Sequence, residues 1–279
     1  MNSTNKNQNT TESKLIDVDH VFASKNPALH RLIPGFIIRY LKRLVHQDEI
    51  NDFLERNSNH TEIELVNASL VELFNATVEV KGVAKIPLEG RYLFVSNHPL
   101  GGLDGVAFMT AVGSRFQHLK FPVNDILLNI KTMKDWFIPI NKHGANSKRA
   151  AQLMNDAFSS DSHVLYFPAG LVSRKIKGEI IDLPWKTTFL KKAITYERSI
   201  VPVHISGRNS DFFYNLANLR KNLGIKSNFE MLWLAEEMFK LRDKKIVVSF
   251  GEPIPYQDLK NNNSAFWTTK IREKCYALK

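Results

Sequence analysis

From about residue 76 onward, short apolar segments alternate with amphipathic ones along the sequence. Six segments have the apolar, strand-favouring composition of β-strands: 77–83, 91–97, 119–123, 163–170, 199–207 and 245–255. Helical periodicity covers the stretches between them, at about 104–114, 146–160, 210–222, 228–241 and 264–278. Because this alternation is typical of α/β proteins, we predict an α/β fold over residues 76–279, organised as one domain.

Two different segments precede this domain. Residues 1–14 are polar and rich in Asn and Thr, which predicts a disordered tail. Residues 15–75 are predicted to form a helical extension. Within it, apolar side chains recur at helical spacing, and basic ones surround them: Ile33, Phe36, Ile37, Tyr40, Leu41 and Leu44, with Arg31, Arg39, Lys42 and Arg43. Such an amphipathic helix either lies in a membrane interface or packs its apolar stripe on the domain core, and the sequence leaves both open.

The net charge favours an anionic partner. Lys and Arg number 38 against 28 Asp and Glu, which gives a formal net charge of +10. A basic balance of this kind suits an anionic membrane surface or a nucleic acid. Since no helix-turn-helix, zinc-finger or aromatic RNA-binding pattern is present, we expect no nucleic-acid partner.

Cysteine usage and hydropathy further limit the class of protein and its compartment. The single cysteine, Cys275, excludes a disulfide within the chain and suits a reducing compartment. No apolar run approaches the roughly 20 residues of a membrane-spanning helix, and the start of the sequence lacks the apolar stretch of a signal peptide. The histidines do not have metal-ligand spacing, so we expect no metal site.

Two unusual loops follow apolar strands. "SNHPLGGLDG" follows "YLFV", and "PAGLVSRK" follows "VLYF". In open α/β sheets, ligands bind where strands end and loops begin. If the two strands are neighbours, these loops face one another across one crevice.

The first loop has the residue types of a general base and its orienting group. A neutral imidazole takes a proton from a hydroxyl group best when a carboxylate fixes its tautomer, and Asp104 is the acid nearest to His98. Gly101 and Gly102 would allow a sharp turn between them and a close approach of substrate. The alternative is a structural His98 with Asp104 as a helix cap, and these two residues alone do not separate the alternatives.

Four blocks in order resemble the glycerolipid acyltransferase family, which includes the lysophosphatidic acid acyltransferases. They span roughly residues 76–255: Asn97, His98 and Asp104; an apolar stretch followed by Lys142; Phe167, Pro168, Gly170 and Ser173; and Val201, Pro202 and Val203. The spacing of the first block, with five residues between the histidine and the aspartate, is similar to a bacterial hemolysin-like subgroup that O-acylates lyso-aminolipids.

This resemblance implies a mixed sheet flanked by helices and an O-acyltransferase activity. In the family, the histidine deprotonates the acceptor hydroxyl, the aspartate orients the histidine, and a thioester on acyl carrier protein or coenzyme A donates the acyl group. No other cofactor is implied. The resemblance also implies a set of residues that bind substrate: Asn97, Gly101, Gly102, Lys142, Phe167, Pro168, Gly170, Ser173 and Arg174. The expected partners are this thioester, a lysolipid acceptor and an anionic membrane surface, and the expected location is peripheral, on the cytoplasmic face of the inner membrane.

The third block departs from the family pattern. Ala169, Leu171 and Val172 stand where the family has Glu, Thr and Arg, residues that help to hold the glycerol and phosphate of the acceptor. Arg174, Lys175 or Lys142 is a candidate for the missing cation, and a solvated basic loop is the alternative for Lys175. The change favours an acceptor other than lysophosphatidic acid, such as a lyso-aminolipid. Phosphatidic acid synthesis, a serine hydrolase that uses Ser173, and a non-catalytic lipid-binding protein are the alternatives.

Overall fold

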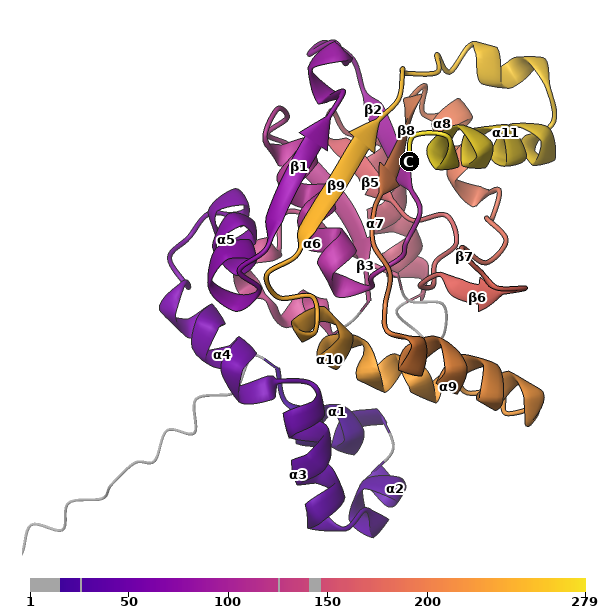
Figure 1. Cartoon of the computed structure of the whole chain (residues 1–279). Coiled ribbons are helices and arrows are strands. Elements are labelled where there is room, and N and C mark those ends of the chain that lie inside the picture. Colours follow the sequence, from indigo (N-terminus) through magenta and orange to yellow (C-terminus); the bar gives the residue numbers. More distant parts are fainter. Residues whose placement is uncertain (1–15, 26, 125, 141–146) are drawn as a thin grey trace, which may run out of the picture.

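The computed structural model describes residues 16–25, 27–124, 126–140 and 147–279. Within these ranges, seven strands form one sheet in the order β1-β9-β8-β2-β5-β3-β4 (Figure 1). Their bounds are β1 Thr77–Lys81, β2 Tyr92–Ser96, β3 Leu119–Val123, β4 Phe137–Pro139, β5 His163–Tyr166, β8 Ser199–Ile205 and β9 Lys245–Phe250. Strand β9 is antiparallel to β8 and the other neighbours are parallel, so the predicted mixed sheet is confirmed.

Helices cover both faces of the sheet. One face packs on α5 (Glu62–Ala68), the π-helical turn η1 (Ser69–Leu73) and α6 (Gly102–Gly113). The other packs on α7 (Ser147–Ser159), α8 (Thr188–Thr195) and α11 (Ser264–Tyr276). Because successive strand residues point to opposite faces, Phe94 of β2 joins the first core and Leu93 and Val95 join the second. The second core also contains Cys275, which is fully buried.

A second group of elements lies beyond the carboxyl ends of β2 and β8. It includes a two-stranded antiparallel hairpin of β6 (Arg174–Ile176) and β7 (Glu179–Ile181), and the helices α9 (Asp211–Asn222) and α10 (Leu234–Phe239), which a 3₁₀ turn η5 (Phe229–Trp233) joins. Figure 1 shows α10 and α9 one beyond the other across the lower end of the molecule. This end of the sheet carries the two loops singled out in the sequence.

The N-terminal extension is helical, as predicted. It comprises α1 (Val18–Lys25), α2 (Pro27–Leu32), α3 (Gly35–Leu44) and α4 (Gln47–Arg56), followed by α5 and η1. In α3 the side chains of Ile38 and Leu44 are buried, whereas Phe36 is 64% exposed and Tyr40 is 53% exposed. The stripe is therefore buried at Leu44 and exposed at Phe36 and Tyr40, so the described residues cover only part of it.

Elements that the sequence did not predict are short. Strand β4 and the β6–β7 hairpin use three residues per strand, too few for a period of two to be recognised. Helix α8 has eight residues between two loops. The predicted tail at 1–14 lies outside the described residues, and the boundary at 75/76 stays a prediction, with η1 ending at Leu73 and β1 beginning at Thr77.

Candidate active site

The loops after β2 and β5 meet at one edge of the sheet. The two strands are parallel neighbours, with Leu93 opposite Val164 and Val95 opposite Tyr166. Their carboxyl ends therefore point the same way, and the backbone N–H of Ser173 donates to the carbonyl oxygen of His98 at 2.7 Å. The prediction that these loops lie together is confirmed.

The imidazole of His98 is hydrogen-bonded to the carboxyl group of Asp104, with Nδ1 2.7 Å from Oδ2. The same oxygen accepts the backbone N–H groups of Leu100 at 2.8 Å and Gly101 at 3.0 Å. Asp104 lies in the first turn of α6 and is fully buried. Burial raises the pKa of this carboxyl group, and the hydrogen bonds from His98 and the two amides act in the opposite direction. The structure thus joins the two residues that the sequence paired.

The ring of His98 is held on a second side by Phe167. The two rings are stacked, with centroids 4.1 Å apart and planes 10° from parallel, and Phe167 also contacts Phe108 and Phe121. Since Nδ1 faces Asp104, the lone pair of the neutral imidazole is on Nε2, which has no hydrogen-bond partner within the described ranges. This is the geometry that a general base requires.

Asp182 connects the two loops, and the sequence did not single it out. Its Oδ1 accepts the backbone N–H of His98 at 3.1 Å and the hydroxyl of Ser173 at 2.6 Å, and its Oδ2 accepts Nε1–H of Trp185 at 2.8 Å. Its own N–H donates to the hydroxyl of Tyr276. Asp182 is 2% exposed, so these bonds are shielded from water. It follows strand β7, which is too short to be predicted, and no sequence motif marks it.

Glycine is favoured at positions 101 and 102 for two different structural reasons. Gly101 has φ +90°, a conformation that favours glycine, so the predicted sharp turn is confirmed. At Gly102, a Cβ atom would lie 2.4 Å from the sulfur of Met238, on α10. The group that approaches this glycine closely in the structure is thus α10, and Leu234 of the same helix packs beside Gly101. A substrate contact at the two glycines stays a prediction.

Other predicted residues support the loops. The side-chain amide of Asn97 donates to the carbonyl of Ile205 and accepts its N–H, which ties the end of β2 to β8. The carbonyl of Pro168 accepts the backbone N–H of Lys186. The N–H of Gly170 donates to the carbonyl of Phe167 at 3.0 Å, so this amide already has an internal acceptor. Direct substrate contacts of these residues stay predictions.

The third block is built differently from a serine hydrolase site. The hydroxyl of Ser173 is buried and its acceptors are the carboxyl group of Asp182 and the backbone carbonyl of His98, rather than a histidine ring. Arg174 is also buried, and it is paired with Glu230 at 2.9 Å, so its charge is balanced inside the protein. Its predicted contact with the acceptor headgroup is untested. Lys142, another candidate cation, lies outside the described residues.

A buried amide group lies near the acid of the site. Asn209 is 2% exposed, and its side-chain nitrogen and oxygen have no hydrogen-bond partner in the described part of the chain. Its backbone N–H donates to the hydroxyl of Tyr214. Burial raises the pKa of Tyr214, and the nearby carboxyl groups of Asp104 and Glu237 add to this increase. A polar group of a bound substrate would complete such an amide.

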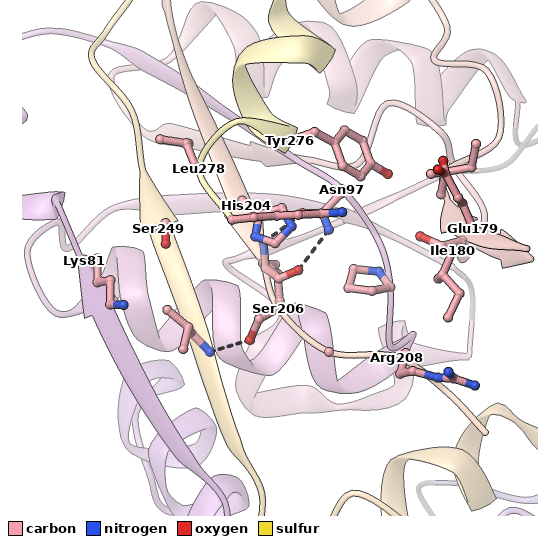
Figure 2. A pocket seen from close by; sticks show the side chains of 17 residues that line it. Lys81, Asn97, Glu179, Ile180, His204, Ser206, Arg208, Ser249, Tyr276 and Leu278 are labelled. Carbon is pink, nitrogen blue, oxygen red and sulfur yellow. Dashed lines mark hydrogen bonds between the residues drawn. The ribbon is translucent and has the colours of Figure 1, made fainter. Parts of the chain in front are cut away.

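A cavity of about 800 Å³ lies behind the catalytic loop rather than at His98. Figure 2 shows His204, Tyr276 and Leu278 on one side of it and Glu179 and Ile180 on the other. Because Val203 and Ile205 face α6, His204 between them points to the opposite face of the sheet. Burial and the charge of Lys279 lower the pKa of His204 to about 4. His98 itself lies on the α6 face and does not line this cavity.

Two further features concern metals and membranes. Among the described residues, no cluster of three or more His, Cys, Asp or Glu side chains is arranged to hold a metal ion. None of the described helices is both long and apolar enough to cross a bilayer.

Comparison with known proteins gives consistent matches. A family model described as Acyltransferase matches residues 20–279. A lyso-glycine lipid O-acyltransferase from Bacteroides thetaiotaomicron is 47% identical over 266 residues, which cover 95% of this chain and 97% of the relative. A second protein of that name, from Phocaeicola vulgatus, is 44% identical over 266 residues and covers 95% of each chain.

A solved structure, the 1-acyl-sn-glycerophosphate (LPA) acyltransferase PlsC from Thermotoga maritima, is similar with a TM-score of 0.49 and 15% identity, over 86% of this chain and 89% of that one. The family model covers the sheet, both loops and the N-terminal helices from residue 20 onward. With relatives that match along almost their whole length, this chain belongs to the acyltransferase family.

Proposed function

We propose that this enzyme transfers a fatty acyl group from a thioester to the hydroxyl group of a lyso-aminolipid, with a lyso-glycine lipid as the acceptor. The observation that carries the proposal is the bond between His98 and the buried Asp104, at the edge of the sheet where two loops meet. The names of the two relatives support the acceptor class. The altered third block, with Ala169, Leu171 and Val172, agrees with an acceptor other than lysophosphatidic acid.

The proposed reaction uses the pairing of His98 with Asp104. Nε2 of His98 removes the proton of the acceptor hydroxyl, and the hydroxyl oxygen attacks the carbonyl carbon of the thioester. A new carbon–oxygen bond forms and gives a tetrahedral oxyanion. When the oxyanion collapses, the carbon–sulfur bond breaks, and the thiolate takes the proton back from the imidazolium. Asp104 holds the ring in the required tautomer and stabilises its positive charge during the reaction.

The donor and the location belong to the same proposal. Acyl carrier protein or coenzyme A would present the thioester, and both are cytoplasmic, which favours the cytoplasmic face of the inner membrane. The reaction needs no cofactor, because the thioester itself is the activated group. The exposed apolar side chains of α3 support peripheral attachment, with Phe36 and Tyr40 in the interface and Arg39 and Arg43 at anionic headgroups.

The test is transfer of a labelled acyl group in detergent-dispersed mixtures. Wild type, His98→Ala and, as a matched control, His118→Ala would receive acyl carrier protein or coenzyme A thioesters with either a lyso-glycine lipid or lysophosphatidic acid. His118 is exposed and lies outside the loops, so its variant should keep full activity. We expect transfer to the lyso-glycine lipid, abolished in His98→Ala. Release of free fatty acid without an acceptor would indicate a hydrolase, and equal transfer by His98→Ala would exclude this histidine as the base.

A further inference from the structure

A cationic pocket lies between the β6–β7 hairpin and α9, at the same end of the molecule as the catalytic loop (Figure 1). Its volume is about 440 Å³. Five basic residues line it, together with three asparagines: Arg174, Lys175, Lys177, Arg220 and Lys221, and Asn218, Asn222 and Asn228. The structure shows no Asp or Glu among the described residues that form its wall.

The charges around this pocket are not balanced. Arg174 and Arg220 share one carboxylate, that of the buried Glu230, at 2.9 Å and 2.8 Å. Two guanidinium groups and one carboxylate leave a net positive charge beneath the pocket floor. Lys177 and Lys221 are exposed, and neither has an ion pair with another described residue. The pocket therefore offers an anion several uncompensated cations and neighbouring amide donors.

Exposed apolar side chains lie beside the lining residues along the chain, and one of them, Ile176, lines the pocket itself. Leu219 and Leu223 are 54% and 64% exposed, and their spacing of four residues places them on one side of α9. Ile176, on the opposite wall, and Ile225 are exposed as well. A free phosphate compound or an acidic protein would leave these side chains in water. A lipid would accommodate both parts, with its headgroup in the pocket and its acyl chains against the leucines.

The position of the pocket relative to α3 agrees with a single membrane-facing end. Helix α9 continues from β8 on the side to which the carboxyl end of β2 points, and α3 contacts η5, the turn that follows α9. Figure 1 shows the N-terminal helices and α9 along this lower end, with α11 at the opposite end. The apolar side chains of α3 and α9 therefore lie at the same end of the molecule as the loop that carries His98.

We propose that this pocket binds the phosphate group of an anionic phospholipid in the membrane, with Leu219 and Leu223 inserted among the acyl chains. The phospholipid is neither donor nor acceptor; it anchors the enzyme beside its acceptor. The inference rests on the proposed function only in that the acceptor is a membrane lipid. Lys177, on the hairpin wall, and Lys221, on the α9 wall, would contact the phosphate of the headgroup. The net positive charge of Arg174, Arg220 and Glu230 beneath them would add to the attraction.

The experiment is vesicle binding by the full chain. Vesicles of phosphatidylcholine alone, of phosphatidylcholine with phosphatidylglycerol, and of phosphatidylcholine with oleate at equal surface charge would be compared by sedimentation. We expect the tightest binding to phosphatidylglycerol, because oleate supplies the charge without a phosphate. Each of Lys177→Ala and Lys221→Ala should weaken this binding about five-fold, and the double variant about 25-fold. Lys270→Ala with Lys274→Ala, on α11, removes the same charge at the far end and should change binding much less.

Several results would overturn the inference. Equal binding to phosphatidylglycerol and oleate vesicles would mean that the pocket acts only through its positive charge and does not recognise a phosphate group. Inorganic phosphate that binds with the same affinity as the vesicles, measured by calorimetry and lost in the double variant, would assign the pocket to a soluble ligand. Loss of affinity for acyl carrier protein, with normal vesicle binding, would assign it to the donor. Acyl transfer to a detergent-dispersed acceptor should persist in both lysine variants; if wild type transfers nothing but still binds vesicles, the proposed reaction fails and the pocket does not.

Discussion

The loop that carries His98 and the end of the molecule proposed to face the membrane are built on opposite principles. In the loop at 97–104, the carboxyl group of Asp104 and the backbone of His98 have several internal hydrogen-bond partners away from water. Along α3 and the pocket beside α9, exposed apolar side chains occur together with cations, such as Lys177 and Lys221, that have no ion-pair partner in the described part of the chain. The difference teaches that the geometry of His98 and Asp104 is fixed within the protein, whereas the outer surface leaves apolar and charged groups uncovered, as the proposed membrane contact requires.

The two regions are connected through α10. Its Leu234 and Met238 pack on the glycines of the catalytic loop. Its Phe239 is stacked on His46, between α3 and α4, with ring centroids 3.7 Å apart, and its Glu236 is 2.8 Å from Nε2 of the same histidine. Helix α10 thus contacts both the N-terminal helices and the loop that carries the base.

The largest effect that would sharpen the comparison is expected for Asp104→Asn. The amide cannot fix the tautomer that leaves Nε2 of His98 basic, so we expect kcat to fall roughly 10³-fold. The double variant with His98→Ala should lose little beyond the single variants, because the two residues act as one unit. Steady-state kinetics with circular dichroism as a folding control would measure this. Independent, multiplicative losses would contradict the pairing.

Asp182→Ala should have the next largest effect. It removes the acceptor for His98, Ser173 and Trp185, and unsatisfied buried donors cost about 1–3 kcal/mol each, so the free energy of unfolding should fall by about 3 kcal/mol or more. Displacement of the loop should lower kcat by roughly 10²-fold with a smaller change in KM. Denaturant titration and kinetics at low temperature would separate these effects. Asp182→Asn keeps one acceptor oxygen, so its kcat and its free energy of unfolding should lie between those of wild type and Asp182→Ala. If Asp182→Ala changes only the stability, Asp182 does not position His98 for catalysis.

Gly102→Ala tests the contact between the loop and α10. The added methyl group would overlap the sulfur of Met238, and overpacking of this kind costs about 1–3 kcal/mol. We expect reduced stability and an approximately ten-fold lower kcat. Met238→Ala, combined with Gly102→Ala, should recover most of both losses by making room. Failure of this rescue would show that Gly102 is needed for a reason other than the approach of α10.

The smallest effect should come from the incomplete surface. Phe36→Ser should weaken vesicle binding about five-fold, since a partly inserted aromatic side chain contributes about 1 kcal/mol. The free energy of unfolding should stay within about 0.5 kcal/mol of wild type because the side chain is exposed. The matched control is Phe266→Ser on α11, which is also exposed but faces away. A large loss of stability in Phe36→Ser would mean that this side chain is part of the core.

The sequence predicted the architecture and the main pair of site residues for physical reasons. Buried parallel strands have continuous apolar runs, so β2, β5 and β8 were recognisable, and their shared edge followed from the α/β rhythm. His98 and Asp104 are six positions apart, close enough for a local argument. Asp182 is 84 positions from His98 and joins it only through tertiary packing, which no single-sequence pattern encodes. The need for glycine at position 102 could likewise not be predicted, because Met238, which packs against it, belongs to a helix far away in the sequence.

The basic residues show the same limit. The sequence singled out Arg174 as a cation for the acceptor, but its pairing with Glu230 depends on how the hairpin packs on η5 and α9. Charge on a loop does not reveal whether a carboxylate will meet it in the fold. The exposure of Phe36 and Tyr40 was also undecidable from periodicity, because a stripe on a helix has the same spacing whether protein or lipid covers it.

The burial of Cys275 has a practical consequence for measuring this enzyme. The thiol is fully buried in the second core, and burial raises its pKa far above the ordinary value, so it stays protonated and inaccessible in the folded protein. With coenzyme A as the proposed donor, each acyl transfer would release one new thiol into solution. A disulfide reagent that reports thiols by colour would therefore count turnovers continuously, without a background from the folded enzyme. The same property leaves the surface open for a single introduced cysteine, carrying a fluorescent probe, to report contact with a bilayer.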